Sequence, residues 1–256
     1  MKTLLKAFFY INLIALLACD NQADNLIVSN SGTSGSITRF ATMDDFMYTL
    51  NPNQLQTFDI TDPSNPVLLN ELETDYGLET IFIYENRIYL GARTGLYILG
   101  LDDPSNPNLL SQTLRTAQFF GGCDPVVVKD NYAYSTVKTI VNVCETVNVQ
   151  SALIVYEVSD PENPILTQTF ILDIPNGLAV TDQYLYVCDT GSESLRVFDI
   201  SSPDDIVSTP ELDYPIVDPF DIIIDDDRMI VSTLNDFNIL SIDDTGAIKY
   251  VKTIAK

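Results

Sequence analysis

Carboxylates are the side chains of this 256-residue chain best suited to chemistry, because the sequence contains 36 Asp and Glu but no His. Polar residues stand at corresponding places in three successive segments of the chain, Glu79, Asp124 and Asn176, and in the next segment Asp221 lies directly after the corresponding residue, Phe220. If these segments fold alike and meet around an axis, the four side chains form a ring at one mouth of a central channel. Such a ring offers oxygen ligands to a cation such as calcium, or hydrogen-bond acceptors to a sugar. The alternative is that each side chain caps the loop before it through backbone amides.

The other acidic residues form no motif that indicates a particular reaction. Asp225–Asp227 falls between two apolar runs and lacks the spacing of a calcium-binding loop, so a solvated turn is its simplest interpretation. Without histidine, serine triads and most zinc hydrolase sites are excluded. We therefore expect no enzyme and no cofactor, apart from calcium at the ring. The alternative is a glycan-directed hydrolase or lyase that uses a pair of carboxylates, although no local motif singles out such a pair.

A turn sequence that recurs along the chain supplies the segments that would position these side chains. It begins as Phe58-Asp-Ile-Thr-Asp-Pro-Ser-Asn-Pro66 and returns about every 42 residues, with about 15 additional residues in the third segment. The later copies are Leu101–Pro107, Val158–Pro164, Phe198–Asp205 and the more divergent Leu240–Gly246. Proline disfavours a helical residue before it, and Asp and Asn bond their own backbone, so each copy predicts a tight turn. A fixed period of this length indicates a repeat architecture.

Short apolar runs around each turn predict β-strands. Runs such as Thr80–Tyr84, Arg87–Leu90 and Gly95–Leu99 are rich in Val, Ile, Tyr and Phe and end at Asn, Asp, Gly or Pro. Four short antiparallel strands in about 42 residues are typical of one propeller blade, and blades stack because none buries both faces alone. We therefore predict an all-β chain that folds as a five-bladed β-propeller of four-stranded antiparallel blades and closes into a ring. A β-sandwich or a β-solenoid is the alternative, but neither fits the period as well.

The expected organisation is a leader over residues 1–18, a flexible tether over 19–35 and the propeller over 36–256. The five blades are expected at about 36–76, 77–118, 119–174, 175–215 and 216–256. The apolar run within Asn25–Ser29 could add a strand that closes the ring with the last blade.

The N-terminus has the features of an export signal. Lys2 and Lys6 precede an apolar run from Ala7 to Ala18 that is too short to span a bilayer as a stable helix. The sequence Leu16-Leu-Ala-Cys19 resembles a bacterial lipobox, which implies cleavage before Cys19 and attachment of diacylglycerol to its sulfur. An ordinary secretory signal is the alternative.

The charge of the chain excludes one class of partner. Removal of the leader leaves 11 basic against 36 acidic residues, a net charge near −25. Such a surface repels nucleic acid and anionic lipid, so no nucleic-acid partner is expected. The simplest role of the excess acid is solubility.

The remaining cysteines would meet an oxidising compartment after export. Cys123 and Cys144 lie at the two ends of the enlarged third segment, where a disulfide would close a loop of about 20 residues and contribute roughly 3 kcal/mol. A metal site is the rival interpretation, but two cysteines without histidine make a poor one. Cys188 falls in the middle of a predicted strand, which favours a buried structural thiol over a nucleophile.

The recurring Asp-Ile-Ser/Thr-Asp-Pro-x-Asn-Pro turns resemble the LVIVD repeat of exported bacterial and archaeal β-propeller proteins. The stretches Cys123–Val128 and Leu185–Asp189 resemble lipoproteins of this group from Bacteroidota. The resemblance covers nearly the whole chain after the leader, although the fourth turn lacks the second proline and the fifth lacks both. It implies the propeller fold and a place on the cell surface, with the acid-rich tether as an export signal. It implies no activity, since a fold alone never does.

These observations predict a lipoprotein of the cell envelope, anchored in the outer membrane through Cys19 and exposed at the cell surface. Its propeller is expected to be a non-enzymatic binding or scaffold module for a protein or a carbohydrate.

Overall fold

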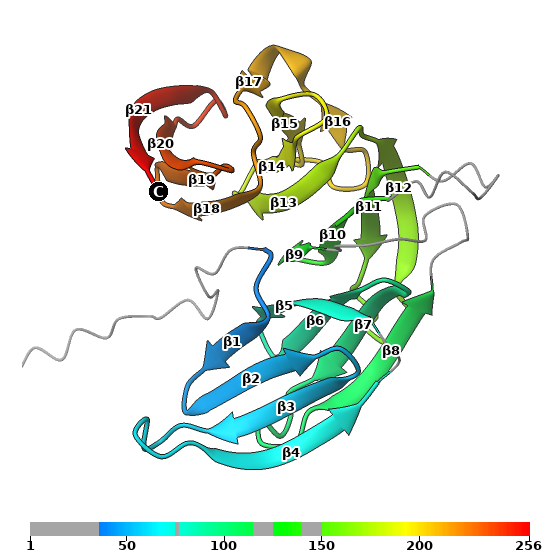
Figure 1. Cartoon of the computed structure of the whole chain (residues 1–256). Helices are drawn as coiled ribbons and strands as arrows, with labels where there is room; N and C mark the ends of the chain where they lie inside the picture. The colour runs from blue at the N-terminus through cyan, green and yellow to red at the C-terminus, as the bar shows by residue number, and fades with distance from the viewer. Residues whose placement is uncertain (1–35, 75–76, 115–124, 140–149) are drawn as a thin grey trace, which may run out of the picture.

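Five antiparallel sheets make up the computed structural model, which describes residues 36–74, 77–114, 125–139 and 150–256 (Figure 1). Each sheet is built from strands that are consecutive in the chain, so each is one blade. The predicted all-β propeller architecture is therefore confirmed. The leader, Cys19, the tether, the Asn25–Ser29 run, Asp124 and the Cys123–Cys144 pair lie outside the described residues.

The strands of each blade follow in chain order. Blade 1 contains β1 (Phe40–Met43), β2 (Phe46–Asn51), β3 (Gln54–Asp59) and β4 (Val67–Glu73). Blade 2 contains β5 (Leu78–Tyr84), β6 (Arg87–Ala92), β7 (Gly95–Gly100) and β8 (Asn108–Leu114). Blade 3 contains β9 (Val126–Lys129), β10 (Tyr132–Val137), β11 (Ala152–Glu157) and β12 (Ile165–Ile171). Blade 4 contains β13 (Pro175–Val180), β14 (Tyr184–Asp189), β15 (Ser194–Asp199) and the short strands β16 (Val207–Ser208) and β17 (Tyr214–Pro215), with a 3₁₀ turn at Pro210–Leu212 between them. Blade 5 contains β18 (Asp221–Asp225), β19 (Arg228–Ser232), β20 (Asp236–Ile242) and β21 (Ile248–Ala255).

The recurring Asp-Pro turns form as predicted, between the third and fourth strands of a blade. In the first copy the Asp62 carboxylate accepts the Ser64 N–H at 3.0 Å, and the Asn65 N–H donates to the Asp62 carbonyl at 2.9 Å. The second copy repeats both bonds, with Asp103 and Ser105 in the same roles. The turn is therefore held by its own polar groups, which explains why these residue types recur.

The same turns also join each blade to the one before it. Their carbonyl oxygens accept hydrogen bonds from side chains of the preceding blade: Tyr48 Oη to Pro104 O (2.9 Å), Ser111 Oγ to Pro161 O (2.6 Å), Gln168 Nε2 to Pro203 O (3.4 Å) and Tyr186 Oη to Gly246 O (3.4 Å). The period of the sequence thus reflects two constraints at once, the shape of the turn and its contact with a neighbouring blade.

The core lies between the blades. The inner strands pack in the order β1, β5, β9, β13 and β18, and the second strands contribute a tyrosine to each junction. These tyrosines are at most 1% exposed: Tyr48, Tyr89, Tyr134 and Tyr186. Burial of large apolar side chains at successive junctions is the main stabilising contribution expected for stacked repeats.

The predicted closure into a ring is not seen in the described part of the chain. Blades 1 to 5 form an arc whose open side lies between β1 and β18 (Figure 1). The outward face of blade 1 carries Thr42, Thr49 and Gln56 where blade 2 has the buried apolar positions of Ile83, Leu90 and Tyr97, although Met47 and Phe58 lie on the same face of blade 1.

The chain enters the arc across its axis. Ser36 Oγ donates to Asp221 Oδ1 of blade 5 at 3.1 Å and accepts the Leu178 N–H of blade 4 at 2.8 Å. Two residues later the Thr38 carbonyl accepts the Ile81 N–H of blade 2 at 3.0 Å. The entry segment therefore links blade 2 to the adjoining blades 4 and 5 across the arc.

Over the described ranges, no helix has the length and apolar character needed to cross a membrane.

Candidate functional site

The predicted ring residues lie near the starts of the inner strands, at the end of the blades where the chain enters. Glu79 is in β5, Asn176 is in β13 and Asp221 begins β18, whereas Asp124 falls outside the described residues. Each of the three has its own protein partners. Glu79 Oε1 forms an ion pair with Arg93 Nε at 2.9 Å.

Asn176 is buried, and both ends of its amide are used. Its Nδ2 donates to Thr190 Oγ1 at 2.6 Å and to the Ile174 carbonyl at 3.1 Å, while Oδ1 accepts from Lys138 Nζ at 3.2 Å. This side chain holds the loop that leads into β13 against the loop after β14, which is a structural role.

Asp221 sits at the seam between blades 4 and 5. Burial raises the pKa of its carboxyl above the ordinary value, and hydrogen bonds from Ser36 and from nearby backbone N–H groups oppose that shift. A Cβ on Gly177 would lie 2.3 Å from Asp221 Oδ1 and 2.8 Å from its Cα, so only glycine fits opposite this carboxylate.

Only Asp221 accepts backbone N–H groups as the capping alternative expects, whereas Glu79 pairs with an arginine side chain and Asn176 bonds side chains and a backbone carbonyl. No group of three Asp, Glu or Cys side chains that could hold a metal ion occurs among the residues that the structure describes. Calcium or sugar binding at the ring stays a prediction that depends on Asp124.

A second polar region lies at the opposite end of blades 4 and 5. A cleft of about 360 Å³ opens there between three turns, one from blade 4 and two from blade 5. Its polar lining is dominated by five aspartates and two tyrosines: Asp182, Asp226, Asp227, Asp243, Asp244, Tyr184 and Tyr186. Asp226 and Asp227 belong to the turn predicted to be a solvated tip, and the sequence did not show that this tip faces two other acidic turns.

Two carboxylates of the cleft are held in their ionised form by neighbouring donors. A hydrogen bond from Lys129 Nζ, at 2.7 Å, lowers the pKa of Asp182. Hydrogen bonds from Thr245 and from Lys249 hold the pKa of Asp243 well below its usual range. No Lys or Arg contributes to the lining within the described residues. Besides the two carboxylates that Lys129 and Lys249 bond, the cleft presents Asp226, Asp227 and Asp244 beside Tyr184, a lining suited to a cationic group or to the hydroxyl groups of a sugar.

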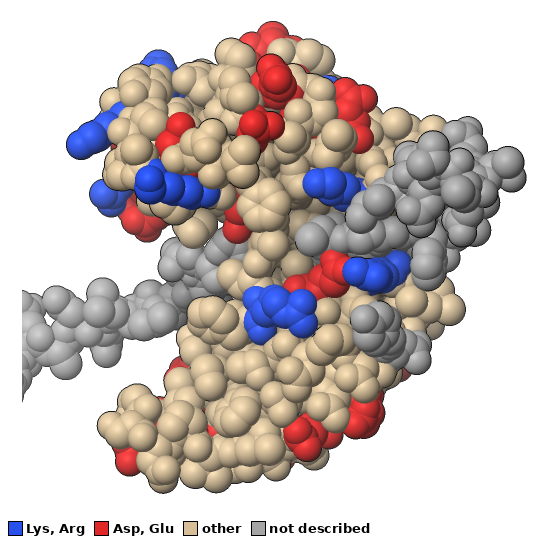
Figure 2. All heavy atoms as spheres, viewed as in Figure 1, with Lys and Arg blue, Asp and Glu red and all other residues tan. Residues whose placement is uncertain are grey.

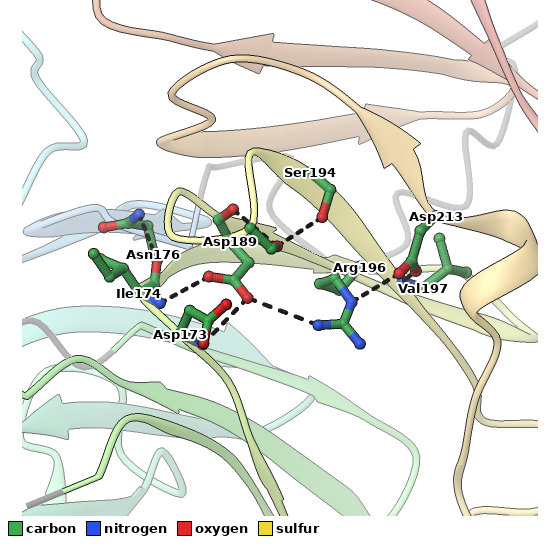
Figure 3. A network of polar contacts seen from close by, with 9 residues as sticks. Asp173, Ile174, Asn176, Asp189, Ser194, Arg196, Val197 and Asp213 are labelled. Atoms are coloured by element: carbon green, nitrogen blue, oxygen red, sulfur yellow. Dashed lines mark hydrogen bonds and ion pairs between the residues drawn. The ribbon is translucent and has the colours of Figure 1, made fainter.

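A third polar cluster, inside blade 4, is structural (Figure 3). Asp189 is fully buried and accepts the Ile174 N–H at 2.8 Å, with Arg196 Nη1 at 3.9 Å. Arg196 Nε also bonds Asp213 Oδ2 at 2.8 Å, and the other Asp213 oxygen accepts the Val197 N–H at 2.8 Å. Blade 4 has only short pieces of a fourth strand, so Asp213 takes over a hydrogen bond that a full strand would provide. Two carboxylates that share one guanidinium make a poor catalytic pair.

Cys188 occupies the middle of β14, is fully buried and forms no disulfide. Burial raises the pKa of its thiol well above the ordinary value, which keeps it protonated. Both observations agree with the structural role expected from its position.

Comparison with known families finds the LVIVD repeat at residues 35–74 and 175–208, which correspond to blade 1 and most of blade 4. No curated protein matches the chain. The chain therefore carries the repeat that its turns resemble.

Several solved structures are similar in fold. A protein of unknown function from Desulfotomaculum acetoxidans has a TM-score of 0.67 at 11% identity, over 85% of this chain and 69% of that one. A protein from Lactobacillus plantarum has a TM-score of 0.65 at 13% identity, over 83% and 68% of the two chains. The periplasmic gluconolactonase PpgL of Pseudomonas aeruginosa has a TM-score of 0.64 at 11% identity, over 84% and 70%. Identities this low establish a common fold only.

Proposed function

We propose that this chain, a β-propeller with LVIVD repeats, is a non-enzymatic binding module that holds a basic segment of a partner protein in the cleft between blades 4 and 5. The observation that carries the proposal is the lining of that cleft, where five aspartates meet beside Tyr184. Lys129 and Lys249 bond two of them, Asp182 and Asp243, so Asp226, Asp227 and Asp244 are the carboxylates offered to a ligand. An Arg or Lys of a partner would gain charge-assisted hydrogen bonds from the carboxylates and cation–π contact with Tyr184. The excess of acid over the whole chain would also speed the approach of such a partner.

A carbohydrate is the second candidate ligand. Carboxylate oxygens and the Gln183 amide of the same cleft can bond sugar hydroxyl groups, and Tyr184 can pack on a sugar ring. Five aspartates in one cleft favour the basic protein segment, because neutral sugars gain nothing from the net charge.

Attachment to the cell envelope through Cys19 is part of the proposal. The basic start, the short apolar run and the Leu-Leu-Ala-Cys sequence of residues 1–19 support it. A lipid anchor at Cys19 and a tether of 16 residues before Ser36 would present the propeller at a membrane surface to proteins outside it.

An enzyme that acts on a glycan or a sugar lactone is the alternative function. The solved structure of a gluconolactonase shares the fold, and the carboxylates of the cleft are the groups that glycoside cleavage uses. Against this, hydrogen bonds lower the pKa values of Asp182 and Asp243, whereas a general acid at neutral pH requires a raised pKa.

A binding screen tests the proposal. The purified chain, labelled with a fluorophore, is applied to arrays of basic, neutral and acidic peptides and to a glycan array. Binding is expected on peptides with clustered Lys and Arg, and is expected to weaken steeply as the salt concentration rises, because the contacts are between charges. Binding to glycans alone would indicate that the ligand is a carbohydrate and not a basic segment of a protein. Absence of binding on both arrays, or hydrolysis of array glycans, would contradict the proposed function.

A further inference from the structure

Four large apolar side chains stand exposed at the end of blades 4 and 5 where the chain enters, which we call the entry end. Leu234 is 73% exposed, Val217 64%, Phe220 47% and Ile174 40%. Val217 and Phe220 lie in the loop from blade 4 to blade 5, and Ile174 lies in the loop that leads into β13. Leu234 lies in the turn between β19 and β20. We call these four residues the apolar tips. Exposed apolar side chains that gather in one place mark contact sites for proteins or membranes.

Hydrogen bonds join the loops that carry the apolar tips. The Thr190 N–H donates to the Ile174 carbonyl at 3.0 Å, and the Thr190 hydroxyl donates to the Pro219 carbonyl at 2.9 Å. The Phe220 N–H donates to the carbonyl of Ser232, the last residue of β19, at 2.8 Å. The three loops are therefore parts of one connected surface.

The chain enters beside the apolar tips. Ser36 bonds the Asp221 carboxylate at the seam between blades 4 and 5, and Asp221 follows Phe220 directly. Cys19, the proposed site of the lipid, lies 17 residues before Ser36, which allows a reach of about 60 Å in extended conformation. Of the two ends of the blades, the entry end can meet a membrane without the chain passing around the propeller.

The charged groups also distinguish the two ends. The cleft with five aspartates opens at the end opposite the apolar tips. At the entry end the Lys256 ammonium donates to the Thr233 carbonyl, directly before Leu234, and Figure 2 shows basic side chains gathered around blade 5. A lysine in this place can reach the phosphate groups of lipids, whereas Asp173 and Asp218 at the same end disfavour an anionic surface. The surface that fits the entry end is a bilayer with little net charge.

We propose that the apolar tips insert into the surface of the bilayer that holds the Cys19 lipid, so that the entry end of blades 4 and 5 rests on the membrane. This inference rests on the proposed attachment through Cys19. The anchor holds the tips at high effective concentration beside the bilayer, so that burial of a few side chains suffices for contact. The acidic cleft, at the opposite end of the same two blades, then faces away from the membrane and is open to a partner protein.

The absence of tryptophan from the sequence provides a direct test. Leu234→Trp places a single tryptophan among the apolar tips. The lipidated variant is isolated from membranes and reconstituted in vesicles of phosphatidylcholine, with or without bromine atoms on the acyl chains. Bromine quenches the fluorescence of an indole that touches it. We expect strong quenching of this variant by the brominated lipid, and emission at a shorter wavelength in vesicles than in detergent-free buffer after removal of the lipid anchor.

Val207→Trp is the matched control. Val207 is 53% exposed and begins β16 at the opposite end of blade 4, so we expect the brominated lipid to quench it several-fold less than the Leu234→Trp variant. Circular dichroism shows that both variants are folded, and mass spectrometry shows the lipid on Cys19.

The outcomes separate this inference from the anchor on which it rests. Equal quenching of the two variants, or no quenching of either, in a chain that carries the lipid would overturn the orientation and leave the anchor intact. Emission of the Leu234→Trp variant that changes with protein concentration and not with brominated lipid would replace the bilayer by a second copy of the chain. A chain without lipid on Cys19 would contradict the anchor and this inference with it.

Discussion

Replacing Tyr134 by alanine is expected to lower the free energy of unfolding by about 3–5 kcal/mol, the loss typical of a large aromatic side chain removed from a packed core. Tyr134 is 1% exposed, and its repeat position places it between blades 3 and 4. The cavity would open at a junction in the middle of the arc, where blades on both sides limit collapse. Urea denaturation of the variant and the parent chain measures the difference.

Tyr250→Ala is the matched control, because it removes the same side chain from a position that is 59% exposed. We expect this variant to lose less than about 1 kcal/mol. Similar losses for the two variants would show that the blades are not held together by burial at their junctions, and that the repeat packing described above is wrong.

The Asp189→Ala variant is expected to show the second large effect, again about 3–5 kcal/mol. The substitution leaves Arg196 without one of its two carboxylates and removes the acceptor of the buried Ile174 N–H. Asp182→Ala is the control, because Asp182 also pairs with a basic residue, Lys129, at the shorter distance of 2.7 Å. The side chain of Asp182 is 92% exposed, so its loss is expected to lower the free energy of unfolding by about 1 kcal/mol or less.

This pair of substitutions separates burial from distance. The Asp189–Arg196 contact is the longer of the two, at 3.9 Å, yet its loss should be the more damaging because solvent cannot replace the missing partner. Equal losses in denaturation experiments, or a larger loss for Asp182→Ala, would contradict the structural role assigned to the blade 4 network.

The strands and turns could be predicted from local sequence because their determinants are local. Asp62 and Asn65 bond within their own turn, and runs such as Thr80–Tyr84 are apolar at nearly every position because neighbouring blades cover both faces. Period and composition therefore suffice for the number of blades and for the order of their strands.

The open side of the arc could not be predicted from the turn motif. It concerns side chains on the faces of the blades, and these must be compared between repeats. Thr49 and Gln56 in blade 1 stand at positions that are apolar in blade 2, so the outward face of the first blade is more polar than the equivalent face of the second. That signal was present in the sequence, but it becomes visible only once strand register assigns each residue to a face.

The polar sites were harder to predict, because their members come from different blades. Asp182, Asp226 and Asp243 belong to three separate turns, and only the packing of blade 4 on blade 5 brings them to one cleft. In the same way, Ser36 and Asp221 are 185 residues apart, so the role of Asp221 as a partner of the entry segment could not be inferred from its place in the repeat.

The most direct test of the binding role is a calorimetric titration of the chain with the basic peptide of highest affinity from the array. The parent chain is compared with a variant that carries Asp226→Asn and Asp227→Asn. Asparagine keeps the side-chain shape and tolerates the positive φ of 56° at residue 226. The control variant, Glu71→Gln with Glu73→Gln, removes the same charge from exposed positions on the outer strand of blade 1.

The account predicts that the cleft variant binds about tenfold or more weakly, because each charged hydrogen bond lost is worth about 1.5–3 kcal/mol, and that the control variant binds within about twofold of the parent. An equal loss of affinity in the two variants would mean that only the overall charge attracts the peptide. Unchanged affinity in the cleft variant would place the binding site elsewhere on the protein.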